Sequence, residues 1–87
     1  MKVKINKRFL KDLSNLPPTT KKQIELFAFE ELEKAKDFYQ LGFEKLKGYS
    51  AYYKKRFGNY RIGAKYSDNV LILYRILHRK DIYKFFP

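Results

Sequence analysis

The chain has 87 residues and a mass of 10.6 kDa, the size of one small domain. We therefore expect residues 1–87 to form a single domain. Twenty Lys and Arg against nine Asp and Glu give a net charge of +11, while 45% of the residues are hydrophobic and 18% are aromatic. That hydrophobic content excludes a disordered basic tail. The composition predicts a folded domain whose surface attracts polyanions.

The side chains also exclude several kinds of site. With no cysteine and one histidine, His78, the chain cannot build a disulfide framework, a zinc finger or an iron–sulfur site from its own side chains. The longest apolar run, Val70–Tyr74, is far too short to span a bilayer. We expect a cytoplasmic protein that requires no metal or other cofactor and does not bind membranes.

The N-terminal half predicts a strand and a helical hairpin. Residues 2–5 alternate lysine with branched aliphatic residues, which is typical of a half-buried strand. Asn6 offers an N-cap for a first helix, which must end at Pro17 and Pro18. Thr20 and Gln23 have the spacing of a capping box for a second, longer helix. Its predicted core face carries Ile24, Phe27, Ala28, Leu32 and Ala35.

The C-terminal half changes to a period of two after a connecting loop over residues 37–48. Residues 53–57, 60–66 and 70–77 read as three strands, joined by turns at Gly58–Asn59 and at residues 67–69. The fold class is therefore predicted as α+β, with an N-terminal strand, a helical hairpin and an antiparallel three-stranded meander in a small, mostly antiparallel sheet.

Alternation along residues 60–66 predicts a clean separation of the two faces of that strand. The even positions are apolar or aromatic, whereas the odd positions are Arg61, Gly63 and Lys65. The same rule places Lys54 and Arg56 on one face of the preceding strand, opposite to Lys55. In residues 81–86 we expect Tyr83 and two phenylalanines to pack down.

The positive charge is concentrated in this second half. Residues 1–43 carry nine basic and six acidic side chains, whereas residues 44–87 carry eleven basic and three acidic ones. Seven of the eight tyrosines also lie in the second half, where they could stack on nucleic-acid bases. Several cations are predicted to converge on one face without carboxylates, an arrangement that a bound phosphate would stabilise.

Such a cluster suits the cleavage of RNA without a metal. The RNA 2′-hydroxyl can attack the adjacent phosphate if one group removes a proton and others stabilise the added negative charge. Arginine forks fit the phosphoryl oxygens, a lysine crowded by other cations can act as a general base, and a tyrosine can stack or handle a proton. A basic binding face without catalysis explains the composition equally well.

Three segments together resemble a known family. These are Leu46–Gly48, Tyr53–Arg61 and His78–Tyr83, in that order and spacing. On these segments the chain resembles the RelE/ParE superfamily of toxins from bacterial type II toxin–antitoxin systems, on the side of the RelE-like messenger-RNA interferases. The resemblance covers nearly the whole chain, and the helical hairpin followed by a meander also fits the fold of that family.

The resemblance implies a ribosome-dependent, metal-independent endoribonuclease that cuts messenger RNA in the A site and is held inactive by a cognate antitoxin. It implies that Lys54 and Arg56 act in proton transfer and charge stabilisation, and that Arg61 binds the scissile phosphate. It further implies that Arg79 acts on the leaving group and that Tyr83 stacks on a base or moves a proton. The surrounding residues expected to bind RNA are Lys47, Lys55, Lys65, His78 and Lys80.

Two alternatives stay open at the level of sequence. ParE-like relatives share the fold but inhibit DNA gyrase and lack the catalytic set, so the presence of all five candidate residues favours the ribonuclease. The other alternative is a catalytically inactive basic RNA-binding module.

Overall fold

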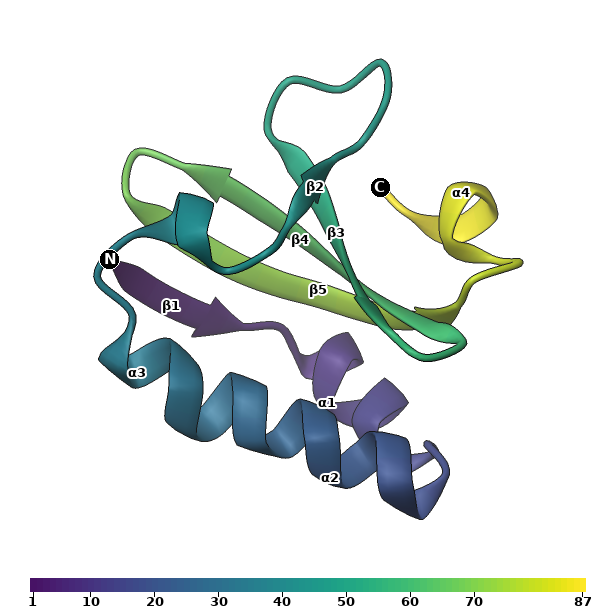
Figure 1. The fold of residues 1–87 in the computed structure, drawn as a ribbon. Coiled ribbons are helices and arrows are strands. Elements are labelled where there is room, and N and C mark those ends of the chain that lie inside the picture. Colours follow the sequence, from purple (N-terminus) through teal and green to yellow (C-terminus); the bar gives the residue numbers. More distant parts are fainter.

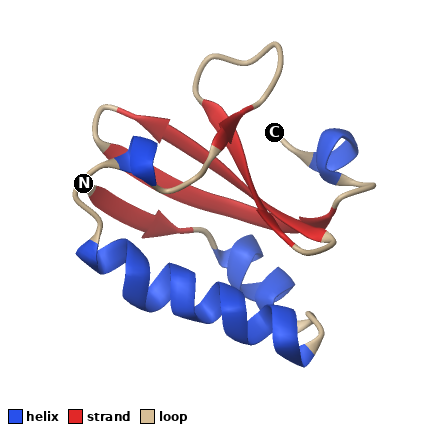
Figure 2. Ribbon diagram, in the orientation of Figure 1, coloured by secondary structure: helices blue, strands red, loops and turns tan.

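The N-terminal strand lies at the edge of a five-stranded sheet in the computed structural model, which describes residues 1–87. The strand order is β1-β5-β4-β3-β2, with β1 parallel to β5 and all other neighbours antiparallel. Helices α1 to α3 lie along one side of the sheet, and α4 lies apart from them near the C-terminus (Figures 1 and 2). The elements are β1 (Lys2–Ile5), α1 (Lys7–Ser14), α2 (Pro18–Leu26), the π-helical turn η1 (Phe27–Glu31), α3 (Leu32–Lys34), the 3-10 turn η2 (Phe38–Gln40), β2 (Glu44–Lys45), β3 (Tyr52–Phe57), β4 (Tyr60–Ser67), β5 (Val70–His78) and α4 (Ile82–Phe85).

The start of the second helix differs from the prediction. Asn6 caps α1 as expected, because its side-chain oxygen accepts a hydrogen bond from the Arg8 N–H. The capping box at Thr20, however, is wrong: α2 begins at Pro18, two residues earlier, without a side-chain cap. Proline fits the first turn of a helix because its fixed φ is helical and its missing N–H needs no partner there. The two prolines therefore end one helix and begin the next.

A π-helical turn shifts the buried face of this second helix. The Leu32 N–H reaches the carbonyl of Phe27, five residues back, so η1 holds one more residue than an α-helical turn would. Four of the five predicted core positions are buried, and Leu32 is among them. Ala35 lies beyond the end of α3 in extended backbone and is only half-buried.

The meander forms as predicted. Gly58 has a positive φ in the first turn, as do Asp68 and Asn69 in the second. Consecutive positive φ angles are typical of the tight turns that match the twist of antiparallel strands. Strand β5 lies between β1 and β4, which explains why residues 70–74 are apolar on both faces. The short strand β2 lies within the predicted loop, because two residues are too few to show a period.

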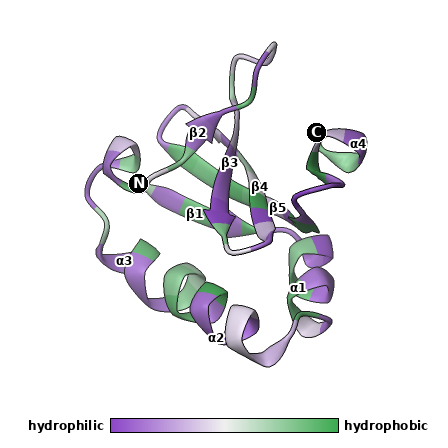
Figure 3. Ribbon diagram, turned by 45° about the vertical axis from the view of Figure 1, so that its right-hand side comes forward, coloured by the Kyte–Doolittle hydropathy of each residue, from purple (hydrophilic) through white to green (hydrophobic).

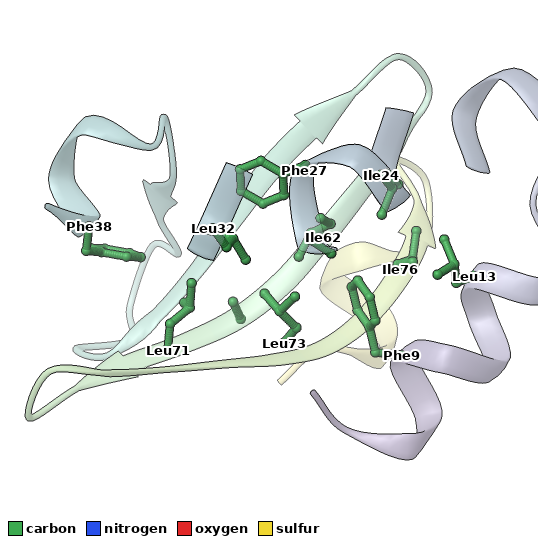
Figure 4. Close-up of a cluster of buried hydrophobic side chains, with 12 residues drawn as sticks. Phe9, Leu13, Ile24, Phe27, Leu32, Phe38, Ile62, Leu71, Leu73 and Ile76 are labelled. Carbon is green, nitrogen blue, oxygen red and sulfur yellow. The ribbon is translucent and has the colours of Figure 1, made fainter. Parts of the chain in front are cut away.

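Each face of the sheet has its own hydrophobic cluster, and the two differ in size. The face under the helices carries a core of twelve buried residues (Figure 4), and Figure 3 shows the middle of the sheet as largely hydrophobic. The opposite face carries only Leu46, Ile82 and Phe86, with Tyr52, Tyr74 and Leu77 packed around them. The core under the helices consists of Phe9, Leu13, Ile24, Phe27, Ala28, Leu32, Phe38, Ile62, Ala64, Leu71, Leu73 and Ile76.

Two sequence expectations fail at this smaller cluster. Strand alternation places Gly63 on the open face with Arg61 and Lys65, but Gly63 is buried because the Phe86 ring packs directly against it. Of the C-terminal aromatic residues expected to pack down, only Phe86 does so. Phe85 is 61% exposed and Tyr83 is 59% exposed.

Asp12 of α1 closes the sheet where β1 ends. Strand β1 pairs with β5 only as far as Leu73, so the edge of β5 is uncovered beyond that point. There the Asp12 carboxylate accepts the backbone N–H of Ile76 at 2.9 Å and forms the one salt bridge of the chain, with the Arg75 guanidinium at 2.8 Å. A side chain thus replaces the missing strand partner.

We predict that Asp12→Ala lowers the free energy of unfolding by about 2–4 kcal/mol, because it leaves a half-buried guanidinium and a backbone N–H without partners. Urea denaturation followed by circular dichroism measures the change. The control is Glu30→Ala, which removes an exposed carboxylate on η1 and should change stability by less than about 0.5 kcal/mol. Equal losses for the two variants would contradict this role of Asp12.

Candidate functional site

A small pocket of about 140 Å³ collects cationic side chains on the face of the sheet opposite to α1 and α2. It is lined by Lys54 and Arg56 from β3, Arg61 from β4 and Glu44 from β2. Arg56 stands directly opposite Arg61 in the register of the two strands, and Lys54 stands opposite Glu44. Like charges directly opposite each other on a sheet are destabilising, so an arginine pair here favours the binding of an anion.

Tyr83 joins this pocket through Lys54. The Lys54 ammonium donates a hydrogen bond to the Tyr83 hydroxyl over 2.6 Å and lies 4.8 Å from the centre of the tyrosine ring. Tyr83 comes from α4, twenty-nine residues along the chain, so the contact depends on how α4 sits on the sheet. The exposed remainder of the ring is available for stacking.

The guanidinium of Arg61 is partly fixed by the turn between β3 and β4. Its Nη1 donates to the carbonyl oxygens of Gly58 and Tyr60, each over 2.9 Å. Nε and Nη2 make no hydrogen bond within the chain. Because the fork is held at one nitrogen and free at the others, it is oriented in advance to bind a phosphoryl group.

Arg79 lies beside the same turn but does not line the pocket. Its backbone N–H donates to the carbonyl of Asn59 over 2.7 Å, which ties the residues after β5 to the β3–β4 turn. Its side chain is exposed and makes no hydrogen bond within the chain. The structure therefore places Arg79 next to the β3–β4 turn, with a guanidinium that no group of the chain engages.

Of the five residues expected to bind RNA, Lys47 and Lys80 are exposed and Lys65 is half-buried. Lys47 is exposed in the β2–β3 loop, and Lys80 is exposed in the turn before α4. Lys65 lies over the ring of Tyr52, with its Nζ 5.7 Å from the ring centre, on the face covered by α4.

Lys55 and His78 lie on the other face, toward the helices, and the structure does not bring them to the pocket. The Lys55 ammonium donates to the carbonyl of Leu41 over 2.7 Å and lies 5.1 Å from the ring centre of Phe27. His78 packs against Tyr60, whose side chain contacts the core under the helices. Strand alternation predicts this place for Lys55, but the clustering of basic residues in the sequence conceals it.

Glu44 is a pocket residue that the sequence does not predict, and it corrects the expectation of a cation cluster without carboxylates. Its carboxylate makes no ion pair with Lys54, since the one salt bridge of the chain lies elsewhere. No sequence signal identifies Glu44, because strand β2 is too short to be predicted. The pocket can thus bind an anion, stabilise added negative charge, and offer both a proton donor and a proton acceptor.

No helix of the structure combines the length and the apolar character that crossing a membrane requires.

Comparisons with known proteins agree with this fold. The family model for the ParE toxin of the type II toxin–antitoxin system parDE matches residues 3–83. The chain is 43% identical over 89 residues to the toxin RelE3 of Methanocaldococcus jannaschii, and the match covers 100% of both chains.

Solved structures match as well. The crystal structure of a RelB–RelE antitoxin–toxin complex from Methanococcus jannaschii aligns with a TM-score of 0.79 at 40% identity, covering 97% of this chain and 99% of the other. The isolated RelE toxin of E. coli aligns with a TM-score of 0.64 at 22% identity, covering 95% of this chain and 90% of the other, which shows a shared fold. The chain therefore belongs to the RelE/ParE superfamily of toxins from type II toxin–antitoxin systems.

Proposed function

We propose that the chain is a ribosome-dependent endoribonuclease that cleaves messenger RNA in the A site without a metal. The observation that carries this proposal is the pocket in which Lys54, Arg56 and Arg61 surround one carboxylate. The similarity to a toxin named RelE3 over the whole chain supports it. The charge of +11 supports an RNA target, because binding to the phosphate backbone is driven largely by cationic side chains.

The reaction uses the nucleophile of the substrate itself. The 2′-oxygen forms a bond to phosphorus, the bond from phosphorus to the 5′-oxygen breaks, and the products are a 2′,3′-cyclic phosphate and a 5′-hydroxyl. The free Nε and Nη2 of Arg61, together with Arg56, bind the non-bridging oxygens as their negative charge grows. Arg79, beside the β3–β4 turn, acts on the leaving group, and Tyr83 stacks on a neighbouring base.

Proton transfer requires an acceptor at the 2′-oxygen and a donor at the 5′-oxygen. Glu44 and Lys54 stand opposite each other across β2 and β3 without forming an ion pair, so both groups are available to the substrate. A carboxylate accepts a proton, and an ammonium group donates one. Lys54 already donates to the Tyr83 hydroxyl, so the tyrosine can pass a proton as well as stack.

We predict that Arg61→Ala abolishes codon-phased cuts in messenger RNA, mapped by primer extension after brief induction in cells. The loss of one preorganised charge-stabilising group typically slows a reaction about 10²–10³-fold. Arg61→Lys keeps the charge but loses the fork, so its rate should fall between those of the wild type and Arg61→Ala. Circular dichroism checks that both variants are folded.

The wild-type result also separates the proposed function from its alternatives. Cuts that require translation support the ribonuclease. Growth arrest with intact message would overturn it in favour of gyrase inhibition, and binding of RNA without arrest or cleavage would indicate an inactive basic module.

Two adjacent lysines provide a matched comparison, because they lie on opposite faces of β3. Lys54→Met should lower cleavage on translating ribosomes at least about tenfold, since it removes a charge from the pocket. Lys55→Met should keep cleavage within about threefold of the wild type, because methionine retains the packing on Phe27 and the site lies on the other face. Equal losses of activity would contradict the assignment of the site to one face.

We further propose that a cognate antitoxin binds this chain, since several structural neighbours are complexes of a RelE toxin with a RelB antitoxin. An acidic or amphipathic antitoxin segment would neutralise the basic surface by adding a strand or by laying a helix against it. We expect the dissociation constant to rise at least about tenfold between low and high salt, as calorimetry can measure. A dissociation constant unaffected by salt and by charge reversal of Arg56 would contradict the electrostatic part.

A further inference from the structure

The short helix α4 is held to the sheet by two buried side chains. Ile82 and Phe86 lie four residues apart, are 2% and 4% exposed, and form one hydrophobic cluster with the buried Leu46. Phe86 also contacts the rings of Tyr52 and Tyr74, with centre-to-centre distances of 5.7 Å and 6.0 Å. A helix of four residues has no stability of its own, so these contacts determine where α4 lies.

The Phe86 ring packs directly against Gly63 of β4. A Cβ atom added at Gly63 would stand 2.7–2.9 Å from three carbon atoms of that ring, closer than carbon atoms can pack. Any other residue at Gly63 would therefore displace Phe86. Unlike the glycines of the turns, Gly63 has no positive φ, so the close approach of the ring explains the glycine here.

The same helical segment carries Tyr83 to the pocket. Tyr83 stands three residues before Phe86, is largely exposed, and forms its one side-chain hydrogen bond with Lys54. Ile82 and Phe86 face the sheet, while Tyr83 reaches sideways to β3. The position of the Tyr83 hydroxyl at Lys54 therefore depends on how Phe86 is seated on Gly63.

We propose that Phe86, seated on Gly63, is a positioning residue that sets the Tyr83 hydroxyl against Lys54. Its effect on RNA cleavage rests on the proposed function, whereas its effect on the contact between Tyr83 and Lys54 does not. Phe86 does not line the pocket, so it acts on the site only through Tyr83.

The first test measures the contact itself by NMR on the intact protein. Wild type should show cross-peaks between the Tyr83 ring protons and the side-chain protons of Lys54. Phe86→Ala and Gly63→Ala should both lose these cross-peaks while the amide signals of the core under the helices keep their dispersion. Phe85→Ala is the matched control: this neighbouring phenylalanine is exposed, and its loss should leave the cross-peaks in place.

The second test uses a double-mutant cycle on the rate of cleavage on translating ribosomes. Phe86→Ala alone should slow cleavage about 10–100-fold, since a displacement of about 1 Å at a reacting group can cost that much. In a Tyr83→Ala background, Phe86→Ala should slow cleavage further by less than about twofold, because the residue through which it acts is already absent. Phe86→Leu in a Gly63→Ala background should recover part of the rate lost in Gly63→Ala, since leucine leaves room for the added methyl group.

The outcomes separate the two proposals. Cross-peaks that persist in Phe86→Ala would overturn the positioning role, whether or not the protein cleaves RNA. Loss of the cross-peaks with wild-type cleavage, or full additivity with Tyr83→Ala, would overturn its link to catalysis and leave the proposed function intact. A wild type that shows the cross-peaks but cuts no message would overturn the proposed function alone.

Discussion

The unequal covering of the two faces of the sheet is the constraint on which the rest of the structure depends. Two helices and their extension bury twelve residues against one face, and this layer is large enough to hold the strands together. The other face has only a cluster of three buried hydrophobic residues, of which Ile82 belongs to α4. Side chains beyond that cluster, on β2, β3 and the first half of β4, remain in contact with solvent. Only on such a face can several cations stand close together without losing their hydration.

The charges on this face are arranged for a ligand and not for one another. Arg56 and Arg61 repel each other across the strands, and Glu44 makes no ion pair with the lysine that stands opposite it. In contrast, the one carboxylate on the α1 side that could pair with a strand, Asp12, does so and also completes the backbone hydrogen bonding of β5. An ion pair thus stabilises the uncovered edge of β5, whereas the charges in the pocket stay unpaired, where a phosphate would fit.

Local patterns in the sequence predict most of the sheet. Alternation identifies β1, β3 and β4, and the tight turns fix the meander, because both signals act over only a few residues. Features that depend on packing between distant segments could not be predicted. Strand β2 exists only because β3 lies beside it, and with it Glu44 enters the pocket. Likewise, no local signal shows that Phe86 covers Gly63 while Phe85 remains in solvent.

The candidate site was only partly predictable, because strand alternation distinguishes the two faces of the sheet whereas composition does not. Alternation correctly separates Lys54 from Lys55, because a lysine on the helix side can extend its aliphatic stem along Phe27 and direct its ammonium group to the Leu41 carbonyl. Composition alone treats both lysines as basic residues available to RNA. The same limit applies to His78, which packs on Tyr60 although Arg79, next to it in the chain, is exposed.

This division between the faces has a consequence for how mutations act. Arg56 in the pocket is exposed and makes no salt bridge, so its removal changes stability little while removing charge from the site. Truncating a side chain in the core under the helices has the opposite effect. It leaves a cavity and lowers stability, but it does not change the pocket. The cluster around Phe86 belongs to both groups: it is a buried hydrophobic contact, yet the segment that it holds carries a residue of the pocket. Substitutions there change both the packing of the fold and the geometry of the site, because the smaller of the two hydrophobic clusters holds the segment that brings Tyr83 to Lys54.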